Sequence, residues 1–109
     1  MTTELSPPRK MFGDFAPKLV ELTEDVLFGD VWERPGLSKR DRSLITIAAL
    51  VALNRTEQVR FHLERGFDNG LTKDEVVEAI THLAFYSGWP NTMNAMLLAK
   101  EIVTKRGGT

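Results

Sequence analysis

Apolar residues recur at helical spacing along most of the chain. Between Phe12 and Phe28 they fall three or four residues apart, which predicts one helix that Gly13 or Pro17 could break. No segment alternates apolar and polar residues in the way a half-buried strand does. The pattern therefore predicts an all-α fold, a small bundle of about five to six helices.

Turn and capping residues predict where the following loop and helix begin and end. Residues 29–36 are expected to form a loop, because Pro35 and Gly36 are a strong turn signal. Ser38 is the predicted N-cap of the helix that follows. Within that helix, residues 44–53 are apolar nearly all round, so the helix must be covered on more than one side. Contact with another subunit is the simplest cover, and we expect an oligomer.

The second half of the chain carries three more predicted helices. The first of them ends at Gly70, a residue suited to a left-handed cap. Thr72 and Glu75 have the spacing of a capping box, which begins the second. Residues 87–90, Ser-Gly-Trp-Pro, are expected to separate it from a last helix over residues 91–105.

Length and charge narrow the class of protein. The 109 residues suffice for one domain, which we expect over residues 11–105 after a flexible lead-in at residues 1–10. Fourteen basic and 15 acidic residues nearly cancel, so no basic stripe indicates nucleic acid. The N-terminus lacks the apolar core of a signal peptide, and no apolar run has the length of a membrane span. We expect a cytoplasmic protein without a nucleic-acid or membrane partner.

The two histidines are the only side chains whose ordinary pKa lies near neutrality. His62 sits beside an apolar helical stripe, where it could transfer a proton in a partly desolvated cleft or simply bind a backbone carbonyl. His82 can share a helix face with Glu78 and Tyr86, four residues away on either side, and the alternative there is an ordinary exposed pair. Because the two histidines lie on different predicted helices, no metal site is expected.

A run of cations surrounds the predicted turn before the second helix. It comprises Arg34, Lys39, Arg40 and Arg42. Such a cluster is either a solvated surface or, at the mouth of a cleft, a site that holds a carboxylate substrate.

Between about Phe28 and Lys100 the chain resembles the carboxymuconolactone decarboxylases, with its motifs in the same order and spacing. The matching segments are Trp32-x-Arg34-Pro35-Gly36-Leu37, Arg42-Ser43-Leu44-x-Thr46-x-Ala48-Ala49-Leu50, His62, Asn69-Gly70-Leu71-Thr72, Glu75, Glu78 and Tyr86-x-Gly88-x-Pro90. The resemblance implies an all-helical homo-oligomer, a trimer or hexamer. It also implies decarboxylation of a small carboxylated lactone or related oxo acid without a cofactor.

The resemblance also implies roles for individual side chains. His62 would be the proton donor and His82 a supporting acid or base. Arginine donors would hold the substrate carboxylate and the developing oxyanion. The substrate-binding residues expected on this basis are Arg34, Arg42, Trp32, Tyr86 and Trp89.

The chain departs from the redox branch of the same family, the alkylhydroperoxidase D-like group. That branch carries Cys-x-x-Cys before the matched histidine, and here the two positions are Arg55 and Gln58. With no cysteine in the chain, thiol peroxidase chemistry is excluded. At His82 and Trp89 the family's decarboxylases tend to carry an amide and a smaller apolar residue, so the substrate could differ. Two alternatives stay open: a redox-associated protein without thiols of its own, and a non-catalytic oligomeric module that binds small ligands.

Overall fold

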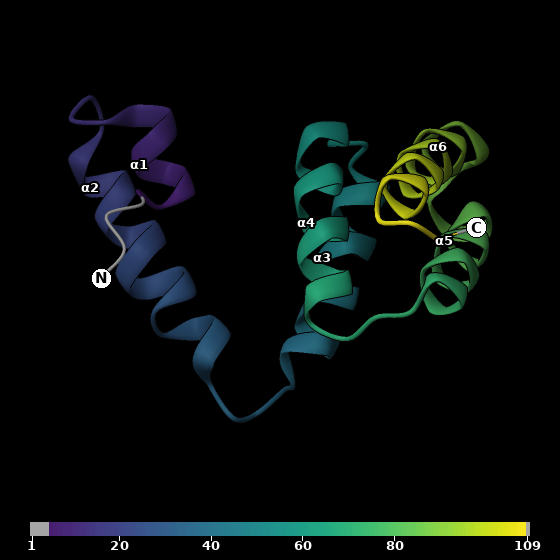
Figure 1. The fold of residues 1–109 in the computed structure, drawn as a ribbon, viewed down its shortest axis with the longest axis horizontal. Helices are drawn as coiled ribbons and strands as arrows, with labels where there is room; N and C mark the ends of the chain where they lie inside the picture. The colour runs from purple at the N-terminus through teal and green to yellow at the C-terminus, as the bar shows by residue number, and fades with distance from the viewer. Residues whose placement is uncertain (1–4, 109) are drawn as a thin grey trace. The chain divides into compact units, whose positions relative to one another are not determined.

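The computed structural model describes residues 5–108, and all the regular elements of these residues are helices (Figure 1). The predicted all-α fold is therefore confirmed for the described part of the chain. The described residues form two compact units, the first ending at Leu37 and the second beginning at Ser38.

The first unit consists of short helices. They are α1 (Pro7–Phe12), α2 (Pro17–Glu21), the π-helical segment η1 (Leu22–Phe28) and the 3₁₀ turn η2 (Val31–Glu33). The helix predicted over residues 12–28 is broken at Gly13, one of the two positions at which a break was expected. Gly13 takes a positive φ of 52° and ends α1, and a new helix begins at Pro17, a residue favoured in the first helical turn.

Residues 7–10 of the predicted flexible lead-in are helical. Ser6 is the N-cap of α1, and its hydroxyl oxygen accepts a hydrogen bond from the Arg9 backbone N–H at 3.4 Å. The two prolines that follow Ser6 are tolerated because the first turn needs no N–H donor. Residues 1–4 of the lead-in lie outside the described residues. The predicted loop at residues 29–36 contains the short turn η2.

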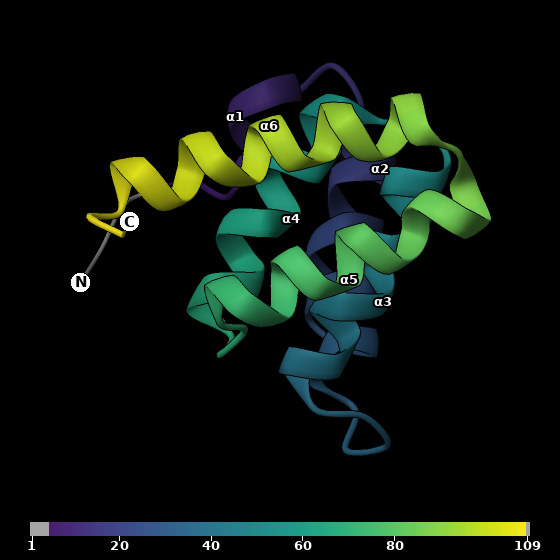
Figure 2. The ribbon, with the colours of Figure 1, turned by 90° about the vertical axis from the view of Figure 1, so that its right-hand side faces the viewer.

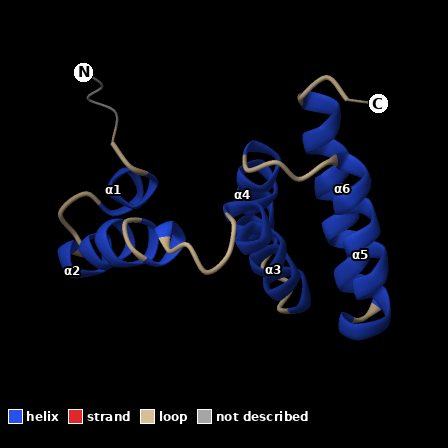
Figure 3. Ribbon diagram, turned by 90° about the horizontal axis from the view of Figure 1, so that it is seen from below, coloured by secondary structure: helices blue, strands red, loops and turns tan. Residues whose placement is uncertain are grey.

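The second unit is made of four longer helices in two hairpins. They are α3 (Lys39–Ala52), α4 (Thr56–Asp68), α5 (Lys73–Ser87) and α6 (Trp89–Lys105). Helix α3 packs against α4, and α5 packs against α6, as Figures 2 and 3 show. The hairpins join through contacts of α4 with α6 and of α3 with α5.

The helix ends of the second unit follow the local sequence closely. The Ser38 hydroxyl oxygen accepts a hydrogen bond from the Asp41 N–H at 3.0 Å, which confirms the predicted N-cap. Thr72 and Glu75 form the predicted capping box, with bonds of 3.1 and 3.0 Å. Gly70 has a positive φ of 106°, as a left-handed cap requires.

The start of α6 differs from the prediction. Only Gly88, with a φ of 96°, breaks the chain between α5 and α6, and α6 begins at Trp89 rather than at residue 91. Pro90 falls in the first turn of α6, where its missing N–H has no helical partner to lose. The break between the two helices is therefore shorter than the predicted residues 87–90.

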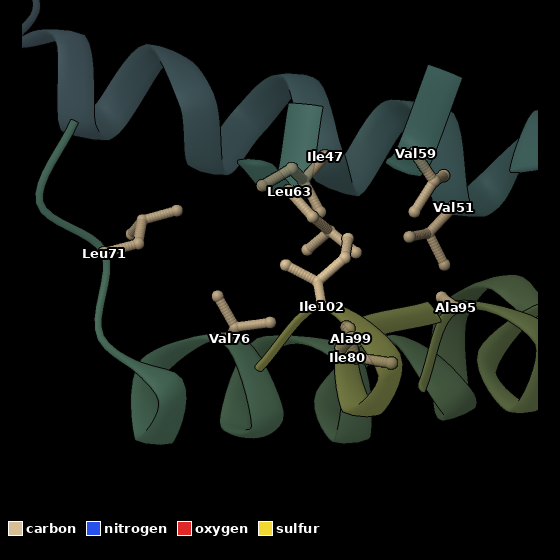
Figure 4. Packing of buried hydrophobic residues seen from close by; sticks show 10 residues of the cluster. All are labelled: Ile47, Val51, Val59, Leu63, Leu71, Val76, Ile80, Ala95, Ala99 and Ile102. Atoms are coloured by element: carbon tan, nitrogen blue, oxygen red, sulfur yellow. The ribbon is translucent and has the colours of Figure 1, made fainter. Parts of the chain in front are cut away.

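The core of the second unit lies between the two hairpins (Figure 4). It consists of Ile47, Val51, Val59, Leu63, Leu71, Val76, Ile80, Ala95, Ala99 and Ile102. Gly66 lets α4 approach this core closely, since a Cβ atom there would lie 2.8 Å from Leu71 Cδ1 and 3.1 Å from Ile47 Cδ1. The two hairpins thus hold the residues of the candidate site on a packed scaffold.

Helix α3 is covered on its core side and open on another. Ile47 and Val51 are buried, whereas Ile45 and Leu53 stay exposed. The prediction that a further chain covers the apolar segment at residues 44–53 is compatible with these exposed side chains, and it stays a prediction.

Candidate functional site

His62 lies on α4 beside the buried positions Val59 and Leu63. The imidazole is half-buried, and its Nδ1 atom is shielded from solvent. Burial lowers the pKa of His62, because the charged form is poorly solvated there, and the positive charge of Arg65 lowers it further. The structure thus confirms that His62 lies at the edge of a buried helix face.

Phe61 and Arg65 flank the imidazole on the same helix. The Phe61 ring meets His62 edge-on, with centroids 5.1 Å apart, and the Arg65 guanidinium carbon lies 5.6 Å from the Phe61 ring centroid. The Nε atom of Arg65 is shielded from solvent. Sequence reasoning missed Arg65, although its position three residues after His62 places the two on neighbouring parts of one helix surface.

The facing helix α3 contributes Ser43 and Arg42. Ser43 is fully buried, and its hydroxyl oxygen accepts a hydrogen bond of 2.9 Å from the Asn69 amide at the end of α4. Arg42 therefore stands near the level of Asn69, about two turns or 10 Å along the hairpin from His62. The α3–α4 hairpin therefore carries Arg42 on one helix and His62 and Arg65 on the other.

His82 is located elsewhere in the second unit. It is exposed on α5, it stacks on Tyr86 with ring centroids 4.8 Å apart, and it lines an open groove of about 480 Å³ between α3 and α5. Arg40 crosses this groove and pairs with Glu75. The pKa of Glu75 is lowered, first by the Thr72 backbone N–H that it accepts and then by Arg40. His62 is not among the residues that line this groove.

The predicted aromatic walls are open to solvent in the single chain. Trp89 packs edge-on against Phe85 with centroids 5.5 Å apart, and both of them, like Tyr86, are exposed. These residues lie on α5 and at the start of α6, whereas His62 and Arg42 lie on α4 and α3. Of the predicted site residues in the second unit, His62 and Arg42 belong to the α3–α4 hairpin, and His82, Tyr86 and Trp89 belong to the α5–α6 hairpin.

Trp32 and Arg34 belong to the first unit. Trp32 is buried in η2, and its ring lies 6.0 Å from that of Phe28. Arg34 is exposed and follows η2 as its C-cap, with its backbone N–H donated to the Val31 carbonyl at 3.3 Å.

Over residues 5–108, no group of three or more histidine, aspartate and glutamate side chains has the arrangement of a metal site. None of the helices described is both long and apolar enough to span a membrane.

Comparison with known proteins finds a matching family model and related proteins. The model of the carboxymuconolactone decarboxylase family matches residues 17–101. The chain is 43% identical over 94 residues to a 4-carboxymuconolactone decarboxylase of Acinetobacter baylyi, a match that covers 86% of this chain and 70% of that protein. It is 32% identical over 83 residues to the nitrosuccinic acid decarboxylase npaB of Metarhizium robertsii, over 76% of this chain and 58% of that protein.

A third relative carries no assigned activity. It is an uncharacterized 15.0 kDa protein of Paracoccus denitrificans, 28% identical over 80 residues, and the match covers 72% of this chain and 60% of that protein. The chain thus spans between 58% and 70% of the length of these relatives.

Proposed function

The chain belongs to the carboxymuconolactone decarboxylase family, and on that premise we propose that it is a cofactor-free decarboxylase of a small carboxylated lactone or related oxo acid. Two relatives named as decarboxylases, at 43% and 32% identity, support a carboxy-lyase. The observation that carries the mechanism is the half-buried His62 beside the positive charge of Arg65.

The names of these two relatives point to a shared substrate chemistry. Nitrosuccinic acid and carboxymuconolactone both hold more than one carboxyl function and an electron-withdrawing group that can accept the electrons left by departing carbon dioxide. In both, an anionic carboxylate remains after the reaction. The site must therefore bind one carboxylate while another leaves, which suits paired guanidinium groups.

The proposed reaction breaks one carbon–carbon bond and forms one carbon–hydrogen bond. The electron pair of the departing carboxylate's carbon–carbon bond enters the conjugated system and gives an enolate. Arg42 and Arg65 stabilise its oxyanion and hold the remaining carboxylate. The His62 imidazolium then donates its proton to carbon and later recovers one from water, so that carbon dioxide and the protonated product leave.

The lowered pKa of His62 is compatible with a proton donor when the substrate's charge is included. In the free protein, burial and Arg65 favour the neutral imidazole. A substrate carboxylate bound beside His62 adds an opposite charge, which favours the imidazolium. Substrate binding would therefore supply the acid that the second step needs.

The other expected roles are part of the proposal. His82 is the supporting acid or base, Arg34 is a second carboxylate anchor, and Trp32, Tyr86 and Trp89 are apolar walls that favour loss of charge from the carboxylate. Helix α5 packs on α3 and α6. Because His82 lines the α3–α5 groove and His62 does not, the proposal has His82 act on the substrate from a neighbouring copy of the chain. We accordingly propose a homo-oligomer, a trimer or hexamer, for which the exposed apolar side chains of α3 are the support.

The test is release of carbon dioxide from 4-carboxymuconolactone and a panel of related carboxylactones and oxo acids. We expect turnover by the purified protein and a loss of about 10²- to 10⁴-fold in His62→Gln, the contribution typical of a general acid. Circular dichroism and the oligomeric mass should be unchanged in that variant. If no panel member turns over although one or more bind saturably, the decarboxylase proposal fails and the non-catalytic binding module is favoured.

A further inference from the structure

A pocket of about 360 Å³ lies between α5 and α6, at the end of the hairpin where α5 begins and α6 ends. We call it the α5–α6 pocket. The start of α5 and the end of α6 lie on the same side of the view in Figure 2. The volume is within the range of small-molecule sites and gives room for about a dozen groups the size of a water molecule. None of His62, Arg42, Arg65 and His82 lines this pocket.

The walls of the α5–α6 pocket are aliphatic. Its apolar lining comes from both helices and consists of Val76, Val77, Met96, Ala99 and Val103. Val76 and Ala99 are each 2% exposed and form the floor, whereas Val77, 37% exposed, lies at the rim. No aromatic side chain lines the pocket, and Met96 is a flexible residue that adapts to irregular shapes. Such a lining suits an alkyl chain rather than a stacked ring.

Two lysine side chains give the α5–α6 pocket a positive charge. Lys73 is the first residue of α5, Lys100 lies in the last two turns of α6, and both line the pocket. No carboxylate side chain is among its lining residues. Within residues 5–108 Lys100 forms no ion pair, and its neighbours three and four residues away on α6 are uncharged. The pocket thus combines an apolar interior with a cationic rim.

The acidic residues next to the two lysines do not line the pocket. Asp74 follows Lys73 and Glu101 follows Lys100, and neither is a lining residue. Glu101 instead pairs with Arg60 of α4 at 3.1 Å. Three of the last carbonyls of α6 accept backbone N–H groups from the turn that follows the helix. An anion beside the two lysines therefore meets positive charge without a facing carboxylate.

From these observations we propose that the α5–α6 pocket binds a medium-chain aliphatic carboxylate, for which octanoate is the probe. Its alkyl chain lies along the aliphatic walls, where burial of each methylene favours binding. Its carboxylate lies at the rim beside the ammonium groups of Lys73 and Lys100, which are point charges suited to a partly exposed anion. A saturated chain has no group that could accept the electrons left by carbon dioxide. The pocket is therefore a binding site separate from the proposed decarboxylation.

Isothermal titration calorimetry of the full chain, with octanoate below its micelle-forming concentration, tests the proposal. We expect saturable binding that is about tenfold tighter for octanoate than for hexanoate, because two more methylene groups are buried. Lys100→Gln should weaken octanoate binding about fivefold, the contribution of a partly exposed ion pair. Lys105→Gln is the matched control, since Lys105 is an exposed lysine of the same helix outside the pocket, and it should leave binding unchanged.

Two further measurements separate charge from chain and locate the ligand. The uncharged 1-octanol should bind more weakly than octanoate, and Lys100→Gln should leave its binding unchanged, because the alcohol has no charge for the lysine to attract. In NMR spectra of the isotope-labelled protein, octanoate should shift the amide signals of Val77 and Val103 and leave that of His62 in place. This pattern distinguishes the α5–α6 pocket from the candidate site.

Each part of the proposal has a result that would overturn it. These results are the absence of saturable binding, equal weakening by Lys100→Gln and Lys105→Gln, or amide shifts centred on His62 rather than on Val77 and Val103. A neighbouring copy that covers the pocket would give the first of them. None of the measurements uses turnover, so a chain that releases carbon dioxide but does not bind octanoate refutes this proposal alone.

Discussion

Substituting Gly66 by alanine probes the close approach of α4 to the core that holds His62 in place. The added Cβ atom would lie 2.8 Å from Leu71 Cδ1, 3.1 Å from Ile47 Cδ1 and 3.7 Å from Ser43 Cβ. The first two distances are shorter than ordinary van der Waals contact, and Leu71 and Ile47 are both buried. The side chains must shift, or α4 must move away from α3 and from Ser43.

Two opposing effects set the magnitude of the Gly66→Ala change. Alanine favours a helix interior over glycine by about 1 kcal/mol. Overpacking a core costs about 1–3 kcal/mol. The free energy of unfolding should therefore fall by about 1 kcal/mol in Gly66→Ala. Gln58→Ala, at an exposed position of the same helix, should stay within about 0.5 kcal/mol of the unsubstituted protein.

Urea unfolding measures both variants, and a double-mutant cycle identifies the cause. Leu71→Ala alone should cost about 2–5 kcal/mol. In the Gly66→Ala background it should cost about 1 kcal/mol less, because it removes the atom that the new methyl group meets. A Gly66→Ala protein that is more stable by the full helix-propensity gain, with no coupling to Leu71, would refute the close approach of the two helices.

Three further outcomes are expected. Thr72→Ala, which removes the capping box with Glu75, should lower the free energy of unfolding by about 1 kcal/mol in urea titrations, and no loss would mean that the cap is not formed. Arg65→Gln should raise the pKa of His62 in an NMR titration, because it removes a positive charge, and an unchanged pKa would refute that contact. Folding lowers the pKa of His62, so the unfolded chain binds a proton more readily than the folded one. The free energy of unfolding should therefore decrease as the pH is lowered below about 6.5. His62→Gln should show a shallower fall, and an identical one would contradict the assignment.

Local sequence signals predicted the helix ends of the second unit, because the residues that make each cap lie within a few positions of one another. Ser38 with Asp41 and Thr72 with Glu75 are such pairs. In the first unit, Gly13 and Pro17 indicated where the helix over residues 12–28 could break, and the chain does break at Gly13. Helical spacing does not reveal that residues 22–28 form a π-helical segment.

The candidate site was predictable where it depends on one helix and not where it depends on pairs of helices. The half-buried position of His62 follows from its place beside an apolar stripe. The bond between Ser43 and Asn69 joins residues that are 26 positions apart, and nothing local indicates it. The location of His82 in the α3–α5 groove is likewise a result of helix packing.

The most direct test of proton donation by His62 compares its NMR titration with the pH dependence of kcat/KM for carbon dioxide release. The account predicts that kcat/KM falls as the pH rises through the pKa of His62, which lies below the ordinary value of about 6.5. The pKa governing kcat should be higher, because the bound carboxylate favours the imidazolium. A kcat/KM that does not change where His62 titrates, or a His62→Gln variant that retains the rate, would contradict the account.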